Sequence, residues 1–172
     1  MKLSPVLLMA SMLIVASSER SAAQDALPRH ITTSVGLFQY ELSRNGVAPM
    51  MAIRGTIPTS SVLVLESGLV ASRPRQEFGG STIFLAPEAQ AQLVLPFSRF
   101  LPYMGLGAGA VLDFRSDQLG GTYANFTVSG SLGIRAWVLN RGGVQVEFRG
   151  RGIGLDFEQT ASEYTAGLIW RL

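Results

Sequence analysis

The chain has 172 residues, of which 47% are hydrophobic and 15% charged, with no cysteine and a formal net charge of +2. This length fits one domain, and the absence of cysteine excludes both a disulfide framework and a thiolate metal site. The small net charge does not indicate the basic surface of a nucleic-acid-binding protein, so no nucleic-acid partner is expected.

The first 23 residues have the layout of a secretory signal peptide. Lys2 supplies the charged start, an apolar run covers 6–16, and small residues precede a cleavage site after Ala23. The apolar run is shorter than the ~20 residues that a membrane-spanning helix needs. We therefore expect a cleaved leader over 1–23 and a periplasmic lead-in over 24–30. Removal of the leader leaves twelve arginines, eleven acidic residues and no lysine.

The remainder of the chain alternates between apolar and polar residues, with clusters of Gly, Pro, Asn and Ser between the alternating segments. Polar, mostly longer connections such as RSDQLGGTYA alternate with short ones such as PTSS and LNRGG, which places the long connections on one side of an antiparallel up-and-down sheet. The last connection, EQTAS, falls in the series of long connections but is shorter than the others in that series. The pattern predicts eight β-strands, at about 31–41, 48–57, 62–72, 82–95, 101–114, 125–138, 143–157 and 162–172.

Each predicted strand has one apolar and one polar face. In 125–138, the apolar residues from Phe126 to Val138 occupy one parity, whereas Thr127, Ser129 and Arg135 occupy the other. The phase of the first strand is ambiguous. The alternation also breaks after Gly150, where Ile153 falls on the formerly polar face. Either a bulge resets the register there, or that end of the strand projects beyond a membrane.

The identity of the polar residues decides which face points inward. A face in water usually carries many Lys and Glu, but the chain beyond the leader has no lysine. Five arginines lie within predicted strands, and each would cost about 2–4 kcal/mol facing lipid at the bilayer midplane. We therefore expect the arginines to face inward and to pair with glutamates of the same parity. The predicted lumen charge cluster consists of Arg54, Glu66, Glu88, Arg135, Glu147, Arg149 and Arg171; Arg151 is the remaining strand arginine.

The last eight residues, TAGLIWRL, resemble the outer-membrane assembly signal of bacterial barrels. That pattern has a polar residue, a Gly two places later, and large apolar or aromatic residues at the third-last and last positions, here Thr165, Gly167, Trp170 and Leu172. The family usually has Phe or Trp where this chain has Leu172. Together with the leader and the eight strands, the chain resembles small outer-membrane barrels of the OmpA/OmpX type.

This resemblance implies a monomer in the cell outer membrane, in contact with outer-membrane lipid and lipopolysaccharide. It also implies recognition by the barrel assembly machinery through the C-terminal strand. The last strand should then present Tyr164, Leu168 and Trp170 to lipid, with Arg171 inward near the periplasmic mouth.

Two motifs invite other interpretations. GLGAGA, at 105–110, matches a dinucleotide-binding pattern, but that pattern requires a following helix, and the next residues continue as strand and loop. We expect its glycines to make room inside the barrel for bulky side chains such as Trp137. His30 is the only histidine in the sequence. A barrel similar to the lipid A deacylases would need a His–Ser pair facing lipid, so His30 is expected to be a surface residue of the lead-in.

No catalytic, cofactor-binding or metal site is therefore expected, and the aspartates show no metal-ligand spacing. The aromatics Tyr103, Trp137, Tyr164 and Trp170 are expected in an interfacial girdle or in the lumen. The connection SRPRQEFGG, over 72–80, is a candidate binding loop because function concentrates in loops.

The sequence thus predicts an all-β fold, an eight-stranded antiparallel up-and-down transmembrane β-barrel over 31–172. Eight strands leave an interior only wide enough for side chains to fill. The predicted role is non-enzymatic, either structural or in surface interactions, with a closed or nearly closed lumen. Two alternatives stay open: a porin-like narrow solute channel, and a soluble secreted barrel whose apolar face points inward and binds an apolar ligand.

Overall fold

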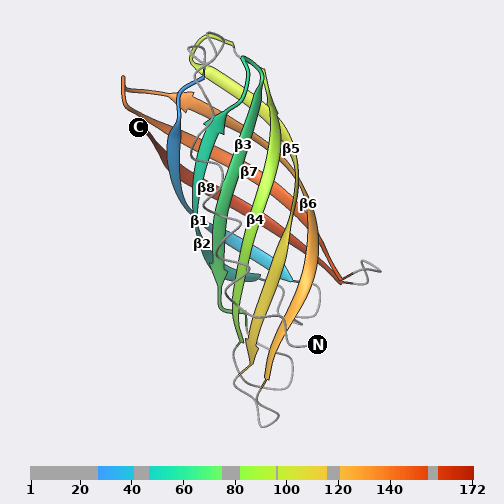
Figure 1. The fold of residues 1–172 in the computed structure, drawn as a ribbon. Coiled ribbons are helices and arrows are strands. Elements are labelled where there is room, and N and C mark those ends of the chain that lie inside the picture. Colours follow the sequence, from blue (N-terminus) through green and yellow to red (C-terminus); the bar gives the residue numbers. More distant parts are fainter. Residues whose placement is uncertain (1–26, 41–46, 75–81, 96, 116–120, 155–158) are drawn as a thin grey trace.

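The computed structural model describes residues 27–40, 47–74, 82–95, 97–115, 121–154 and 159–172. Each strand pairs antiparallel with the next, and β8 pairs with β1, so the sheet closes into an eight-stranded barrel (Figure 1). The predicted all-β up-and-down fold is confirmed. Its strands are β1 (His30–Tyr40), β2 (Val47–Pro58), β3 (Leu63–Ser72), β4 (Thr82–Val94), β5 (Phe100–Arg115), β6 (Gly121–Trp137), β7 (Gly142–Ile153) and β8 (Gln159–Arg171).

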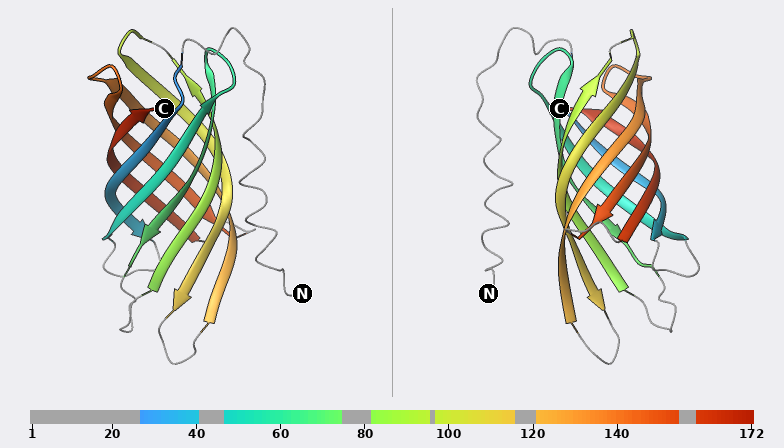
Figure 2. Two further views of the ribbon diagram at one scale, coloured as in Figure 1. Left: turned by 60° about the vertical axis from the view of Figure 1, so that its left-hand side comes forward. Right: turned by 90° about the vertical axis from the view of Figure 1, so that its right-hand side faces the viewer.

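The two ends of the barrel differ in their connections. The turns 59–62, 95–99 and 138–141 lie at the end where β1 begins and β8 finishes, which we call the short-turn end (Figure 2). The other four connections leave from the opposite, long-loop end. The predicted leader lies outside the described residues, as do Arg75 and Phe78 of the candidate binding loop. Within the described ranges, no helix is long and apolar enough to cross a membrane.

The strand register explains the break in alternation after Gly150. β7 pairs with β6 and with β8 without interruption, through Gly130↔Gly150 and Gly150↔Ser162. A bulge, one of the two explanations offered for this break, is therefore wrong. Ile153 points into the barrel with the same parity as Arg149 and is only 2% exposed. The alternation breaks in sequence because the lumen itself becomes apolar at this level.

The outer face of the barrel is apolar and the inner face largely polar. Large hydrophobic side chains such as Val35, Leu106 and Val146 are exposed on the outside, Leu106 to 74% of its surface. Thr32 and Ser34 are buried inside, which settles the phase of the first strand. The alternative of a soluble barrel with an apolar inward face is therefore wrong, because the apolar residues of most strands point outward.

Three layers of side chains fill the lumen. An apolar layer near the long-loop end centres on Phe38 and Phe84, whose ring centroids are 4.6 Å apart. A second apolar layer, near the short-turn end, includes Leu27, Tyr103 and Trp137. Charged and amide side chains occupy the level between these two layers. The remaining members of the long-loop layer are Met50, Ala52, Val70, Ala86, Val111, Ile153 and Ala161, with Tyr40 packed against them.

The glycines of GLGAGA lie within β5, which is paired on both sides and is not followed by a described helix. A Cβ added to Gly105 would lie 2.7 Å from Cδ of Gln90, and one added to Gly107 would lie 2.9 Å from Oε1 of Glu88. These glycines therefore make room for polar side chains of β4. The prediction that they accommodate Trp137 is wrong, because Trp137 lies in the short-turn layer.

Candidate functional site

The middle level of the lumen holds four arginines and four glutamates, which we call the charge cluster. These residues occupy inward-facing positions on six strands, and none of them is more than 6% exposed. Because the two signs occur in equal number, the cluster carries no net formal charge. Its members are Arg54, Glu66, Glu88, Arg135, Glu147, Arg149, Arg151 and Glu163.

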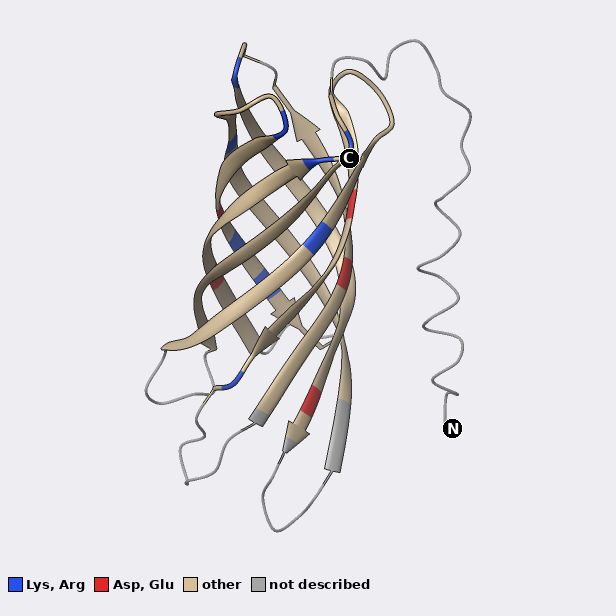
Figure 3. Ribbon diagram, turned by 90° about the vertical axis from the view of Figure 1, so that its left-hand side faces the viewer, with Lys and Arg blue, Asp and Glu red and all other residues tan. Residues whose placement is uncertain are grey.

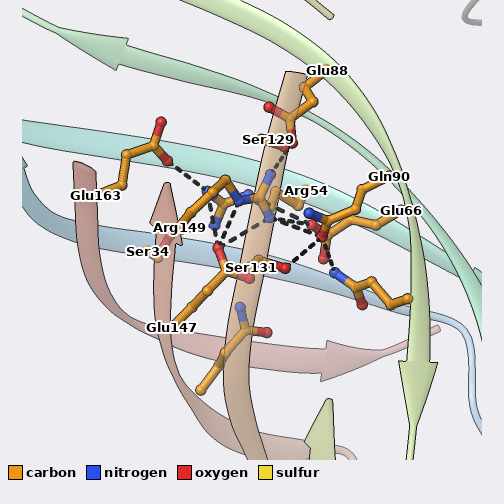
Figure 4. Close-up of polar contacts among 12 residues, drawn as sticks. Ser34, Arg54, Glu66, Glu88, Gln90, Ser129, Ser131, Glu147, Arg149 and Glu163 are labelled. Atoms are coloured by element: carbon orange, nitrogen blue, oxygen red, sulfur yellow. Dashed lines mark hydrogen bonds and ion pairs between the residues drawn. The ribbon is translucent and has the colours of Figure 1, made fainter. Parts of the chain in front are cut away.

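Arg149 on β7 lies at the centre of this cluster (Figure 4). Its Nη2 donates to Oε1 of Glu66 at 2.8 Å, and its Nε donates to Oε1 of Glu147 at 3.1 Å. Its Nη1 donates to Glu88. One guanidinium thus contacts carboxylates from β3, β4 and its own strand, and these contacts tie opposite walls of the barrel together.

Arg151, two residues further along β7, connects the cluster to β8. Its Nη2 donates to Oε1 of Glu163 at 2.6 Å, its Nε donates to the same oxygen at 3.0 Å, and its Nη1 donates to Glu88. The Glu88 carboxylate therefore accepts hydrogen bonds from both Arg149 and Arg151, and one from the hydroxyl of Ser129 at 2.8 Å. A carboxylate with this many charge-assisted donors is compensated for its loss of water.

Arg135 on β6 holds the side of the cluster that faces the short-turn layer. Its Nη2 donates to Oε2 of Glu66 at 3.0 Å and to Oε1 of Gln92 at 2.7 Å. Its guanidinium carbon lies 4.1 Å from the ring centroid of Tyr103, within the range of a cation–π contact. The Tyr103 hydroxyl in turn donates to Oε2 of Glu147 at 2.6 Å. Tyr103 thereby joins the charged level to the apolar layer next to it.

Arg54 on β2 is held by longer contacts than the other three arginines. Its ion pairs with Glu147 and Glu163 measure 3.5 Å, and the one with Glu66 measures 3.8 Å. Its Nη1 lies 3.4 Å from the hydroxyl of Ser34, whereas its Nη2 makes no hydrogen bond with the described residues. The position of Arg54, on β2 beside β1, is therefore the most loosely bonded part of the cluster.

The sequence-based cluster differs from the observed one in three residues. Arg171 lies apart from it: the residue is exposed at the short-turn end, with its guanidinium carbon 5.0 Å from the Trp137 ring centroid. Arg151 and Glu163 belong to the cluster but were not predicted in it. Their inward direction follows from strand alternation. Arg151 is two residues from the inward-facing Arg149, and Glu163 is two residues from the inward-facing Thr165. Arg151 was expected to face inward with the other strand arginines, and the structure confirms this orientation.

His30 is the clearest error of the sequence-based prediction. It is the first residue of β1, points into the lumen and is 4% exposed. Its Nδ1 lies 3.0 Å from the carbonyl oxygen of Pro28, and its ring stands perpendicular to that of Trp137 with centroids 5.7 Å apart. The described part of the lead-in therefore lies at the mouth of the barrel, where Leu27 is also buried.

The residues of the terminal octet divide between the two faces of β8. Thr165 is buried inside and Gly167 is partly buried, whereas Trp170 and Leu172 are exposed outside, Trp170 to 43%. Tyr164 also lies outside, so the four aromatics divide equally between lumen and outer face. In the part of the chain that the structure describes, no group of three or more His, Asp or Glu could hold a metal ion.

No protein-family model and no curated protein matches this sequence. Solved structures match it by fold. Neisserial surface protein A aligns with a TM-score of 0.70 at 10% identity, covering 84% of this chain and 97% of that chain. Ail of Yersinia pestis, in complex with the heparin analogue sucrose octasulfate, aligns with a TM-score of 0.59 at 12% identity, covering 85% and 100%. OprG from Pseudomonas aeruginosa aligns with a TM-score of 0.58 at 11% identity, covering 87% of this chain and 98% of that chain. The chain therefore has the fold of the small eight-stranded outer-membrane barrels.

Proposed function

We propose that this chain is a non-enzymatic β-barrel of the bacterial outer membrane, with a closed lumen and a structural or surface-interaction role. The charge cluster is the observation that carries the proposal. Its four guanidiniums and four carboxylates neutralise one another across the middle of the barrel, with an apolar layer on either side. Each of these eight side chains already has at least one ion-pair partner within the cluster, which does not favour the binding or transfer of a charged solute.

Two features support a location in a membrane. The outer wall presents large apolar side chains from every strand, as a lipid-facing surface requires. Closure of β1 on β8 leaves no open sheet edge, which a bilayer does not tolerate. We infer export through a leader over 1–23, so that the mature protein begins near Gln24. The intact mass of protein from isolated outer membranes tests this, and retention of Met1 to Ala23 would contradict it.

The non-enzymatic role is supported by the position of His30. A lipid-modifying barrel of the deacylase type would need a histidine beside a serine on the lipid-facing wall. The chain has one histidine, and it faces the lumen against Trp137. The protein would then bind lipid or lipopolysaccharide without modifying it chemically.

A closed lumen predicts that the refolded protein conducts poorly. In planar lipid bilayers we expect no stable open-channel steps at neutral pH, because the three side-chain layers block the path. Detergent added without protein is the control. Long-lived unitary steps would contradict the proposal and favour the second candidate, a narrow solute channel. The loose contacts of Arg54 are the observation that supports this candidate, since they would place a path along β1 and β2.

We also propose that the terminal octet is read by the barrel assembly machinery. Trp170→Asp should reduce the yield of heat-modifiable protein in outer membranes severalfold, because it removes an aromatic recognition residue and puts a charge on the lipid side. Leu172→Phe should preserve or raise the yield. Val138→Asp is the matched control, since Val138 is an exposed outer residue at the same end but outside β8. Equal losses from both Asp variants would show that β8 carries no special signal.

A further inference from the structure

Four exposed arginines mark the short-turn end of the barrel, and we call them the basic rim: Arg29, Arg99, Arg141 and Arg171. Figure 3 shows basic segments gathered at the end where the C-terminus lies. From this rim we propose that the protein binds the headgroups of anionic phospholipids in the periplasmic leaflet. The inference rests on the proposed outer-membrane location, in which the short turns face the periplasm.

The backbone places three of these arginines next to one another. The amide of Arg171 donates to the carbonyl of Arg141 at 2.9 Å, and the amide of Leu172 donates to the carbonyl of Arg29 at 3.0 Å. Neighbouring strands lie about 4.8 Å apart, so Arg29, Arg171 and Arg141 span a short arc of the rim. Arg99 continues this arc, because its carbonyl accepts from the amide of Trp137 on the neighbouring strand.

Among the residues that the structure describes, the rim has no side-chain carboxylate of the kind that neutralises the interior. Of the glutamates and aspartates with described side chains, four belong to the charge cluster, and Asp113 faces the lumen beside the long-loop layer. Arg171 contacts the ring of Trp137, and no described side-chain carboxylate forms an ion pair with Arg29, Arg99 or Arg141. Among the described side chains, four arginines are therefore balanced by glutamates inside the lumen, whereas the four at its mouth have no side-chain carboxylate partner.

The depth of the rim fits a phosphate group. Phe97, Phe100, Leu139 and Trp170 are exposed on the outer wall at the same end. Aromatic residues of membrane barrels gather at the level where acyl chains meet headgroups. Arginines beside this girdle lie at the level of the lipid phosphates. An anionic membrane surface strengthens binding by about fivefold per basic residue, so the rim should favour phosphatidylglycerol over a zwitterionic lipid.

Trp170 provides a reporter beside the rim, since it pairs with Ile31 and Gly142 and faces outward. The parent protein is refolded into vesicles containing either phosphatidylglycerol or phosphatidylcholine brominated at acyl positions near the headgroup. Quenching of tryptophan fluorescence then measures which lipid is enriched around Trp170. Trp137, the other tryptophan, lies in the lumen and contributes the same background to every variant.

We expect phosphatidylglycerol to be enriched about fivefold or more around Trp170 in the parent. The double variant Arg29→Gln/Arg141→Gln should lower this ratio severalfold, since only Arg99 and Arg171 remain in the rim, whereas Arg73→Gln, at the long-loop end, should leave it unchanged. The preference of the parent should also decline as salt rises above ~0.1 M, where the Debye length is about 10 Å. This salt series needs no variant and tests the inference even if the double variant does not refold.

Equal quenching by the two lipids in the parent, or an unchanged preference in the double variant, would overturn the inference. Lipid A also carries phosphates, so unlabelled lipid A is added as a competitor at equal phosphate. Stronger displacement by lipid A than by phosphatidylglycerol would overturn the assignment to a phospholipid. Heat-modifiable gel mobility is recorded in each sample to show that the barrel has folded and inserted. A barrel that inserts but shows no lipid preference would contradict lipid binding by the basic rim without contradicting the proposed membrane location.

Discussion

Replacement of Arg149 by methionine is expected to lower the free energy of unfolding by about 3–5 kcal/mol, the usual cost of removing one partner from a buried ion pair. The change removes the contacts that Arg149 makes with Glu66, Glu88 and Glu147. Glu147 would keep only the Tyr103 hydroxyl and the 3.5 Å contact with Arg54. Equilibrium unfolding in urea, followed by tryptophan fluorescence in lipid vesicles, measures the loss.

A second variant tests whether the loss comes from charge. Glu147→Gln in the Arg149→Met background should recover part of the stability, because it restores equal numbers of the two signs and keeps an acceptor for Tyr103. Arg141→Met, in an exposed turn, is the control in phosphatidylcholine vesicles, which offer the basic rim no anionic lipid, and it should change stability by no more than about 0.5 kcal/mol. A double variant that is less stable than Arg149→Met would show that carboxylate repulsion does not cause the loss.

A positive charge on the outer wall should be nearly as costly as the loss of Arg149. Leu132 is 57% exposed on the outside of β6, one residue from Ser131, which pairs with Arg149. It therefore lies at the middle level of the barrel. Leu132→Arg is expected to cost about 2–4 kcal/mol, because the guanidinium would enter the hydrocarbon near the bilayer midplane. The same urea titration in vesicles gives the value.

Leu139→Arg is the matched control for this variant. Leu139 is 71% exposed in the turn between β6 and β7, at the level where charged residues cost about 0–1 kcal/mol. The difference between the two variants therefore reports depth in the membrane. If both changes cost the same, the apolar outer wall does not face lipid, and the proposed location is wrong.

The strands and their two faces could be predicted from the sequence because both depend on local properties. A period of two fixes which residues share a face, and the turn residues fix where each strand ends. The lack of lysine and the cost of arginine in lipid then decided which face points inward. This reasoning placed Arg54, Arg135 and Arg149 in the lumen with Glu66, Glu88 and Glu147, where the structure has them.

Contacts along the barrel axis could not be predicted in the same way. The alternation along a strand shows whether a side chain faces the lumen or the outside. Its position along the barrel axis depends on the stagger between strands, which the alternation does not encode. Arg171 was expected both in the charge cluster and near the mouth; it lies at the mouth, where β8 finishes, and this depth keeps it out of the cluster. His30 was expected in water because it precedes the first predicted strand, whereas pairing with Arg171 and Thr56 includes it in β1.

Several ion pairs of the charge cluster join opposite halves of the chain. Glu66 and Arg149 are 83 residues apart in sequence, and Glu88 and Arg149 are 61 apart. The first four strands contribute two glutamates and one arginine to the cluster, and the last four contribute three arginines and two glutamates. A sheet inserted as either half alone would bring one unmatched charge into the hydrocarbon, together with two open edges. In the proposed membrane location, ring closure and charge neutralisation should therefore be coupled, and we expect hairpins that form early to stay at the membrane surface until the other strands join them.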